Sequence, residues 1–114
     1  MEEFSNDKIW YEGEGKVWFD TYYRFFIYID KLMELGKRAV ELSIHHKSFE
    51  PNLGVYFDSD GLIRIEFYSY CLSLNDRGRH HVIESKNISE VVNELKEWVI
   101  LAEEEIKELE GDFK

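Results

Sequence analysis

A chain of 114 residues with a mass of 13.7 kDa is close to the commonest size of one domain, and two domains would each be too small to bury a good core. Hydrophobic residues make up 44% of the chain and proline occurs once, which excludes a disordered or collagen-like chain. A formal net charge of −10 disfavours direct binding to nucleic acid or to an anionic membrane, because both require cations on the protein.

The excess negative charge lies at the two ends of the chain. Residues 1–20 carry a net charge of −4, residues 21–83 are neutral and residues 84–114 carry −6. No apolar run approaches the roughly 20 residues of a membrane span, and the acidic residues 1–7 do not fit a signal peptide. The single cysteine, Cys71, cannot form an internal disulfide, in agreement with a reducing compartment. We therefore expect one cytoplasmic domain in which residues 1–7 are mobile.

The first part of the chain predicts a hairpin followed by a long helix. Two β-prone runs, residues 8–11 and 16–19, flank the turn-prone residues 12–15. Asp20 is a suitable N-cap for a helix from Thr21 to about His45. The apolar side of this helix comprises Tyr22, Phe25, Phe26, Ile29, Leu32, Met33, Val40 and Ile44. Gly36 lies in that stripe, where it either lets another backbone come close or simply weakens the helix.

The opening turns of this helix are apolar on every side, which is not typical of a helix on the protein surface. The residues concerned are Tyr22, Tyr23, Phe25, Phe26, Ile27, Tyr28 and Ile29. The extra side is covered either by the N-terminal hairpin or by a second copy of the chain. A third alternative is that this stretch is a strand and that the helix begins later.

The middle of the chain predicts an antiparallel meander of three strands. Pro51 and its polar neighbours mark a connection after the first helix. The expected strands and turns are, in chain order, strand 55–57, turn 58–61, strand 62 to about 74, turn 75–78 and a strand at about 80–84. Alternation in the middle strand places Ile63, Ile65, Phe67 and Cys71 toward the core, and Arg64, Glu66, Tyr68 and Tyr70 on the outer face.

The last part of the chain predicts a second long helix. Asn87 and Glu90 have the spacing of a capping box, and Gly111 is suited to the C-terminal end. The apolar stripe consists of Ile88, Val91, Val92, Leu95, Trp98, Val99, Ala102, Ile106 and Leu109. The expected fold class is therefore α+β, an antiparallel sheet of three strands, extended by the N-terminal hairpin if that forms, packed against two long helices.

The side of the second helix opposite its apolar stripe is acidic. Helical spacing places Glu90, Glu94, Glu97, Glu104, Glu105 and Glu108 on one face, with Leu101 in its middle. This face is either an ordinary solvated surface or a docking strip for a basic protein, in which Leu101 is the apolar anchor and the acids steer the encounter. Tyr68 and Tyr70 on the outer sheet face form a second candidate patch for a protein partner, unless another element covers that face.

The sequence offers little that would support catalysis or a cofactor. The histidine pairs 45–46 and 80–81 lack the spacing of a metal site, since adjacent side chains point to different sides of an element. Cys71 is expected on a buried face, where a thiol behaves as a small hydrophobic group. Neither a nucleophile motif nor a phosphate-binding loop is present in the sequence, and the acids of residues 12–15 would repel phosphate.

These observations favour a small acidic protein-binding module without enzymatic activity, metal or cofactor. It would engage a basic protein as an inhibitor, immunity factor or adaptor, in one version by mimicking a nucleic-acid backbone. Two alternatives remain. One is a ligand-binding domain or enzyme with a pocket between the sheet and the helices. The other is a structural homodimer that forms through the aromatic opening of the first helix.

Overall fold

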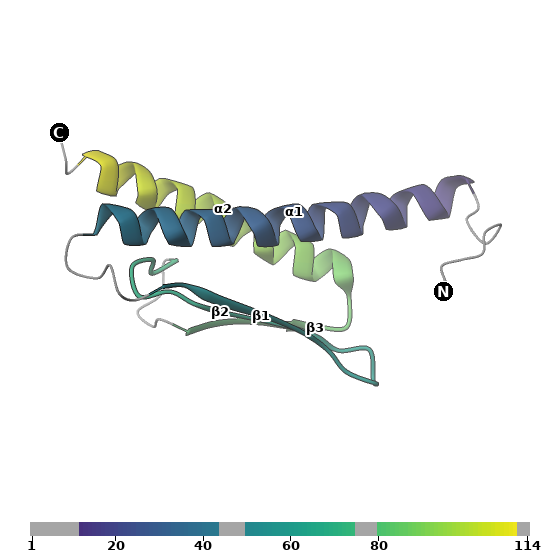
Figure 1. Ribbon diagram of the computed structural model, residues 1–114. Helices are drawn as coiled ribbons and strands as arrows, with labels where there is room; N and C mark the ends of the chain where they lie inside the picture. The colour runs from purple at the N-terminus through teal and green to yellow at the C-terminus, as the bar shows by residue number, and fades with distance from the viewer. Residues whose placement is uncertain (1–11, 44–49, 75–79, 112–114) are drawn as a thin grey trace.

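The computed structural model describes residues 12–43, 50–74 and 80–111, with the backbone alone for residues 12–19. The described elements are, in chain order, α1 (Glu12–Leu42), β1 (Asn52–Phe57), β2 (Ile63–Tyr68), β3 (His80–Ser85) and α2 (Ile88–Gly111). The strands form one antiparallel sheet in the order β1-β2-β3, and both helices pack on the same face of that sheet (Figure 1). This arrangement confirms the predicted α+β class.

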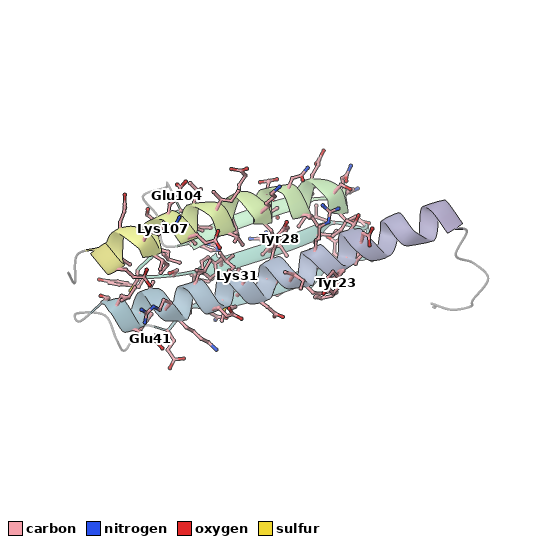
Figure 2. The ribbon with its side chains drawn as sticks, turned by 90° about the horizontal axis from the view of Figure 1, so that it is seen from above. Tyr23, Tyr28, Lys31, Glu41, Glu104 and Lys107 are labelled. Carbon is pink, nitrogen blue, oxygen red and sulfur yellow. The ribbon has the colours of Figure 1, made fainter. Side chains whose placement is uncertain are left out.

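The core lies between the two helices and the inner face of the sheet. Ile63, Ile65 and Phe67 alternate inward along β2 as predicted, while Arg64 and Tyr68 lie on the opposite face. The most deeply buried large side chains come from all three layers and are Phe25, Leu32, Ile65, Phe67, Leu72, Ile83, Val91 and Leu95. The two helices also contact each other over a long stretch, so that the sheet and both helices share one core (Figure 2).

The prediction of a hairpin before the first helix is wrong for residues 12–19, the part of that segment that the structure describes. Residues 16–19, expected as a strand, belong to α1, which begins at Glu12 rather than at Thr21. Asp20 is therefore an interior residue of the helix and not its N-cap. Extending an existing helix adds one hydrogen bond for each residue that is fixed, which outweighs the cost of the glycines at its start. Residues 8–11, the other half of the expected hairpin, lie outside the described residues, as do residues 1–7.

The aromatic opening of α1 is helical, so the alternative of a strand there is also wrong. Phe25 is fully buried, whereas the exposed fractions of Tyr23, Phe26 and Ile27 are 69%, 57% and 45%. The N-terminal part of α1 extends beyond the end of α2 and beyond the sheet (Figures 1 and 2). No element within the described residues covers these three exposed side chains.

Gly36 allows a close approach between α1 and the start of β1. A Cβ atom at this position would lie 2.9 Å from Cβ of Pro51 and 3.4 Å from Cζ of Phe67. Pro51 is itself buried. Of the two interpretations of this glycine, the structure therefore supports close packing, in which the ring of Pro51 occupies the space that a side chain would need.

The turn between β1 and β2 has the predicted chemistry. Gly61 has a φ of 87°, and its N–H donates to the carbonyl oxygen of Asp58 at 3.1 Å. The Asp58 carboxylate accepts the N–H groups of Asp60 and Leu62 at 2.9 and 3.0 Å. A side chain that satisfies two turn amides and a glycine at positive φ together explain why this short sequence closes the hairpin. The turn expected at residues 75–78 lies outside the described residues.

The middle strand is shorter than predicted. β2 ends at Tyr68, and residues 69–74 leave the sheet in an irregular path, although they were expected to continue the strand to about Leu74. Leu72 and Leu74 are buried by this path, and Leu74 has a φ of 51°. The burial of Leu72 and Leu74 in the core therefore stabilises this irregular path more than the β-propensity of the segment would stabilise a longer strand.

Helix α2 begins as predicted, with one difference in the hydrogen bonds that cap its first turn. Oδ1 of Asn87 accepts the N–H groups of Ser89 at 2.9 Å and Glu90 at 3.3 Å. In a capping box the Glu90 carboxylate would accept the Asn87 N–H directly. Here Oγ of Ser85 accepts that N–H at 3.0 Å and donates to Oε1 of Glu90 at 2.7 Å. The box is thus closed through a serine on β3.

Candidate functional site

The acidic face expected on α2 exists and divides into two groups of residues. Glu90, Glu94, Glu97, Glu104 and Glu108 are exposed, whereas Glu105 and Leu101 are half-buried. We call the four exposed glutamates that take part in none of the hydrogen bonds and ion pairs described here the α2 acidic surface. It comprises Glu94, Glu97, Glu104 and Glu108.

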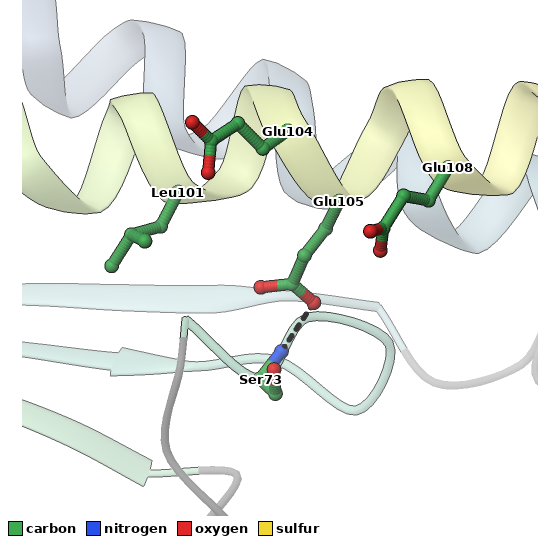
Figure 3. Close-up of a pocket in the computed structure, with 5 residues that line it drawn as sticks. All are labelled: Ser73, Leu101, Glu104, Glu105 and Glu108. Carbon is green, nitrogen blue, oxygen red and sulfur yellow. Dashed lines mark hydrogen bonds between the residues drawn. The ribbon is translucent and has the colours of Figure 1, made fainter.

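Glu105 and Glu90 are committed to contacts within the molecule. The Glu105 carboxylate accepts the N–H of Ser73 at 2.8 Å and that of Leu74 at 2.7 Å, so it holds the segment that follows β2 (Figure 3). Glu90 accepts the hydroxyl of Ser85 at the start of the helix. Both residues were predicted as contacts for a partner, but the structure gives each of them a structural role.

A recess lies beside the α2 acidic surface. It has a volume of about 220 Å³ and is lined by Ser73, Leu101, Glu104, Glu105 and Glu108 (Figure 3). Leu101 packs against the core cluster while part of its side chain remains accessible at this recess. A volume of this size is below that of typical small-molecule sites, but it could hold one apolar or basic side chain of a protein partner.

Other glutamates of the molecule are paired with cations. Glu103 lies 3.9 Å from Nζ of Lys31, and Glu110 lies 3.3 Å from Nη2 of Arg38, so that the α2 carboxylates facing α1 have partners. The residues of the α2 acidic surface have no basic side chain within 4.0 Å in the described part of the chain. The structure therefore separates neutralised acids between the helices from unneutralised acids on the outer side of α2.

The outer face of the sheet is a polar network. Arg64 donates to Glu66 and to Oε2 of Glu84, the latter at 2.6 Å, and the bond to Glu66 is the main cause of the raised pKa of Arg64. Nε2 of His80 lies 3.4 Å from Oε1 of Glu66. The ring of His80 stacks on Tyr68 with a centroid distance of 4.1 Å and an angle of 3°. The charged groups on this face thus satisfy one another.

The two tyrosines predicted to share this face are separated. Tyr68 is the last residue of β2 and is 44% exposed, whereas Tyr70 lies beyond the end of the strand and is half-buried. The strict alternation used in the prediction applies only within a strand. Because β2 ends early, Tyr70 does not join a patch with Tyr68 on the outer face.

The histidines that the structure describes, His80 and His81, and Cys71 show no arrangement for metal or nucleophile chemistry. His80 points outward while His81 is buried and contacts the rings of Phe67 and Trp98. No group of three or more metal-ligating side chains occurs among the described residues, and residues 45–46 lie outside them. Burial raises the pKa of the Cys71 thiol, opposed by a hydrogen bond with Ser43, which leaves less reactive thiolate at neutral pH.

Sequence reasoning missed the structural role of Glu105. Its two partners lie 32 and 31 residues away along the chain, so no local pattern distinguishes Glu105 from its neighbours on the same helix face. Similarly, the accessible part of Leu101 at the recess depends on where residues 73–74 pass, which is a tertiary contact.

Neither described helix contains a stretch that is both long and apolar enough to cross a membrane. In α1 the apolar residues are interrupted by charged ones throughout, and in α2 the glutamates exclude such a stretch. Comparison of the chain with models of known protein families, with curated proteins and with solved structures found no match.

Proposed function

We propose that this protein is a small, non-enzymatic binding module that uses the α2 acidic surface to engage a basic surface of another protein, as an inhibitor, immunity factor or adaptor. The observation that carries the proposal is the contrast between the acids of α2. Those facing α1 are neutralised by Lys31 and Arg38, whereas Glu94, Glu97, Glu104 and Glu108 are exposed without cationic partners in the described part of the chain. A carboxylate that forms no ion pair within its own molecule can form one with a cation of a partner protein.

The geometry of α2 supports a protein partner with a row of basic side chains. At a rise of about 1.5 Å per residue, the four glutamates extend over roughly 21 Å of helix. Leu101 lies within this row, next to a recess of about 220 Å³, and supplies apolar contact area in the middle of charged residues. An apolar centre with a charged rim is the usual arrangement of a protein interface.

Mimicry of nucleic acid is the narrower version of this proposal. Duplex DNA carries one charge for each 1.7 Å or so of its axis, whereas the α2 acidic surface carries about one for each 5 Å. Complementarity to a few spaced basic residues is therefore better supported than imitation of a continuous phosphate backbone. A competition experiment decides between the two, because a mimic is displaced from its partner by nucleic acid and a simple acidic docking surface on another part of that partner is not.

The alternative of a pocket between the sheet and the helices has less support. Core side chains such as Phe25, Phe67 and Leu95 fill the space between these layers. Two further recesses that are lined by described residues, of about 310 and 380 Å³, lie between the C-terminal parts of the helices and beside the start of β1, and most side chains that line each of them are charged. The binding-module proposal therefore rests on the surface and not on a cavity.

The experiment compares charge reversal on α2 with the same charge change on α1. Binding to partners isolated from the native host is measured for the variant E94K/E97K and for the control variant D30K/E34K, whose acids are exposed on α1. We expect the α2 variant to lose at least about tenfold in affinity, the control to bind as the unchanged protein does, and binding to weaken with added salt. Circular dichroism verifies that both variants are folded. Equal binding by the two variants would refute the proposal.

A further inference from the structure

One side of the molecule combines a sheet edge with exposed aromatic side chains. In the described part of the chain β1 is an edge strand with no further strand beside it, and its sequence Asn52–Phe57 contains no charged residue and no proline. Sheet edges are usually protected from pairing with other chains by charges, prolines or bulges. β1 has none of these, and the exposed fraction of Phe57 at its end is 57%.

The hydrogen-bonding groups on this free edge can be assigned from the hairpin. The backbone N–H of Asp58 donates to the carbonyl oxygen of Leu62 at 3.1 Å, which fixes the alternation along β1. Gly54 and Tyr56 therefore bond to β2, whereas the N–H and C=O groups of Leu53, Val55 and Phe57 point away from the sheet. No strand formed by residues 12–43, 50–74 or 80–111 pairs with these outward groups.

Helix α1 lies over the same edge. Phe25 contacts the ring of Phe57 at a centroid distance of 6.3 Å, and a Cβ atom added at Gly36 would lie 2.9 Å from Cβ of Pro51, which precedes β1. Lys37 lines a recess together with Glu50 and Pro51, so this side of α1 faces the edge. Phe26 is eleven residues before Lys37 and therefore lies on the same side of the helix, where it is 57% exposed.

We propose that a second copy of this chain pairs with the free edge of β1, so that two three-stranded sheets join into one six-stranded antiparallel sheet with the α1 helices of both copies side by side above it. Pairing about a two-fold axis at Val55 sets Val55 against its counterpart and Phe57 against Leu53 of the second copy. Each of these pairs uses the outward N–H and C=O groups, and the exposed Phe57 gains an apolar neighbour.

The charges favour a second copy as the occupant. A chain with a net charge of −10 repels itself on most of its surface, but residues 20–42 of α1 contain four acids and four bases, and β1 contains no charge. A copy related by a two-fold axis also covers the strand edge and α1 together, placing Phe26 near Met33 of the second copy, whereas a single extended peptide would cover the edge alone. α2 lies on the β3 side of the sheet, so the α2 acidic surface stays exposed in the dimer.

The test is a matched pair of proline variants at the two sheet edges. V55P removes an outward N–H from β1, and the control V82P removes one from β3, where the alternation also directs the N–H of Val82 away from the sheet. Sedimentation velocity is measured between about 1 µM and 1 mM, a range that covers weak and strong dimers. We expect a dimer for the unchanged protein and for V82P, and a dissociation constant at least about tenfold higher for V55P.

Two further measurements keep the proposal testable if V55P does not fold. F26E changes an exposed helix residue without touching the sheet, and it should also weaken the dimer. Amide hydrogen exchange of Leu53, Val55 and Phe57 should be slow at high protein concentration and fast after dilution.

A monomer at every concentration, or a dimer that none of the β1 and α1 variants weakens, would overturn the proposal. Slow exchange of these amides in a monomer would also overturn it, because another part of the same chain would then occupy the edge.

Discussion

Glu105 illustrates how one carboxylate of an acidic helix can serve the fold while its neighbours do not. Its two oxygens accept the N–H groups of Ser73 and Leu74, which lie in the irregular segment after β2. Leu74 has a positive φ there, an uncommon conformation for a branched apolar residue, and it is buried. The carboxylate thus stabilises a backbone conformation that the local preferences of the segment would not favour by themselves.

We predict that E105A lowers the free energy of unfolding by about 1–3 kcal/mol, because two amides lose a charged acceptor. E104A and E108A, on the same helix face, should change the free energy by no more than about 0.5 kcal/mol. Urea denaturation of the three variants measures the difference. Equal effects of all three substitutions would contradict the structural role of Glu105.

Gly36 provides a second prediction about a single residue. In an open helix, replacement of glycine by alanine stabilises the helix by about 1 kcal/mol. At Gly36 the added Cβ would lie 2.9 Å from the rigid ring of Pro51, so we expect G36A to destabilise the protein by about 1–3 kcal/mol instead. The control is G111A, where no atom lies within 4 Å of the added Cβ. Thermal unfolding should give a lower midpoint for G36A alone, and an increase for G36A would show that the contact with Pro51 is loose.

Among the elements, α2 combines a local start signal with a tertiary contact. Asn87 caps the first turn from within its own segment, whereas Ser85 links Glu90 to the end of β3. The cap therefore fixes both where the helix begins and how it leaves the sheet. Since the residues of the α2 acidic surface follow on the same helix, its start determines which side they face.

We expect N87A to destabilise the protein by about 1 kcal/mol, and N87D to retain most of the stability because aspartate offers the same acceptor. S85A should cost less than N87A, since it removes the link to Glu90 and leaves the two cap bonds of Asn87 intact. Chemical denaturation of the three variants measures these values. If S85A cost as much as N87A, the cap would depend mainly on the β3 contact.

Helix α1 shows why element type is easier to predict than element length. Its apolar periodicity was recognised from the sequence, but the helix begins nine residues before the expected Thr21. The glycines of residues 12–15 and the β-prone residues 16–19 compete with helix locally. Propagation from an already stable helix reverses that local preference, and only the assembled molecule provides the stable helix.

At the scale of the whole molecule, charge is distributed unevenly. α2 carries eight acids and two bases, whereas the described side chains of α1 are balanced between four acids and four bases. Among the described residues, the structure places the α2 glutamates without cationic partners on the outer side of α2, and it places the balanced helix over the β1 edge of the sheet. This uneven distribution of charge is the basis of our two proposals, a basic partner protein at α2 and a second copy of the chain at β1.

We predict that stability rises when salt increases from about 0.01 M to 0.1 M, which shortens the Debye length from about 30 Å to 10 Å. Like-charged pairs three or four residues apart, such as Glu94 with Glu97 and Glu104 with Glu108, each cost about 0.2–0.5 kcal/mol at low salt. The variant E94Q/E108Q should show a smaller response to salt. Denaturation at a fixed protein concentration measures both, and a loss of stability on adding salt would contradict the prediction.

The sequence alone determined the α+β class, the inward alternation of Ile63, Ile65 and Phe67, the Asp58–Gly61 turn and the start of α2. These features depend on residues close together in the chain, where periodicity, turn chemistry and capping act directly. The acidic face of α2 was also recognisable, since helical spacing follows from the sequence.

Only the tertiary structure decided which of these residues remain exposed. Glu105 is bound to a segment more than 30 residues away, Tyr70 falls beyond a strand that ends early, and Phe26 stays exposed while its neighbour Phe25 is buried. The physical reason is that such outcomes depend on contacts between segments distant in sequence. A local pattern places a side chain on a face of its own element, but the packing of the other elements decides what that face meets.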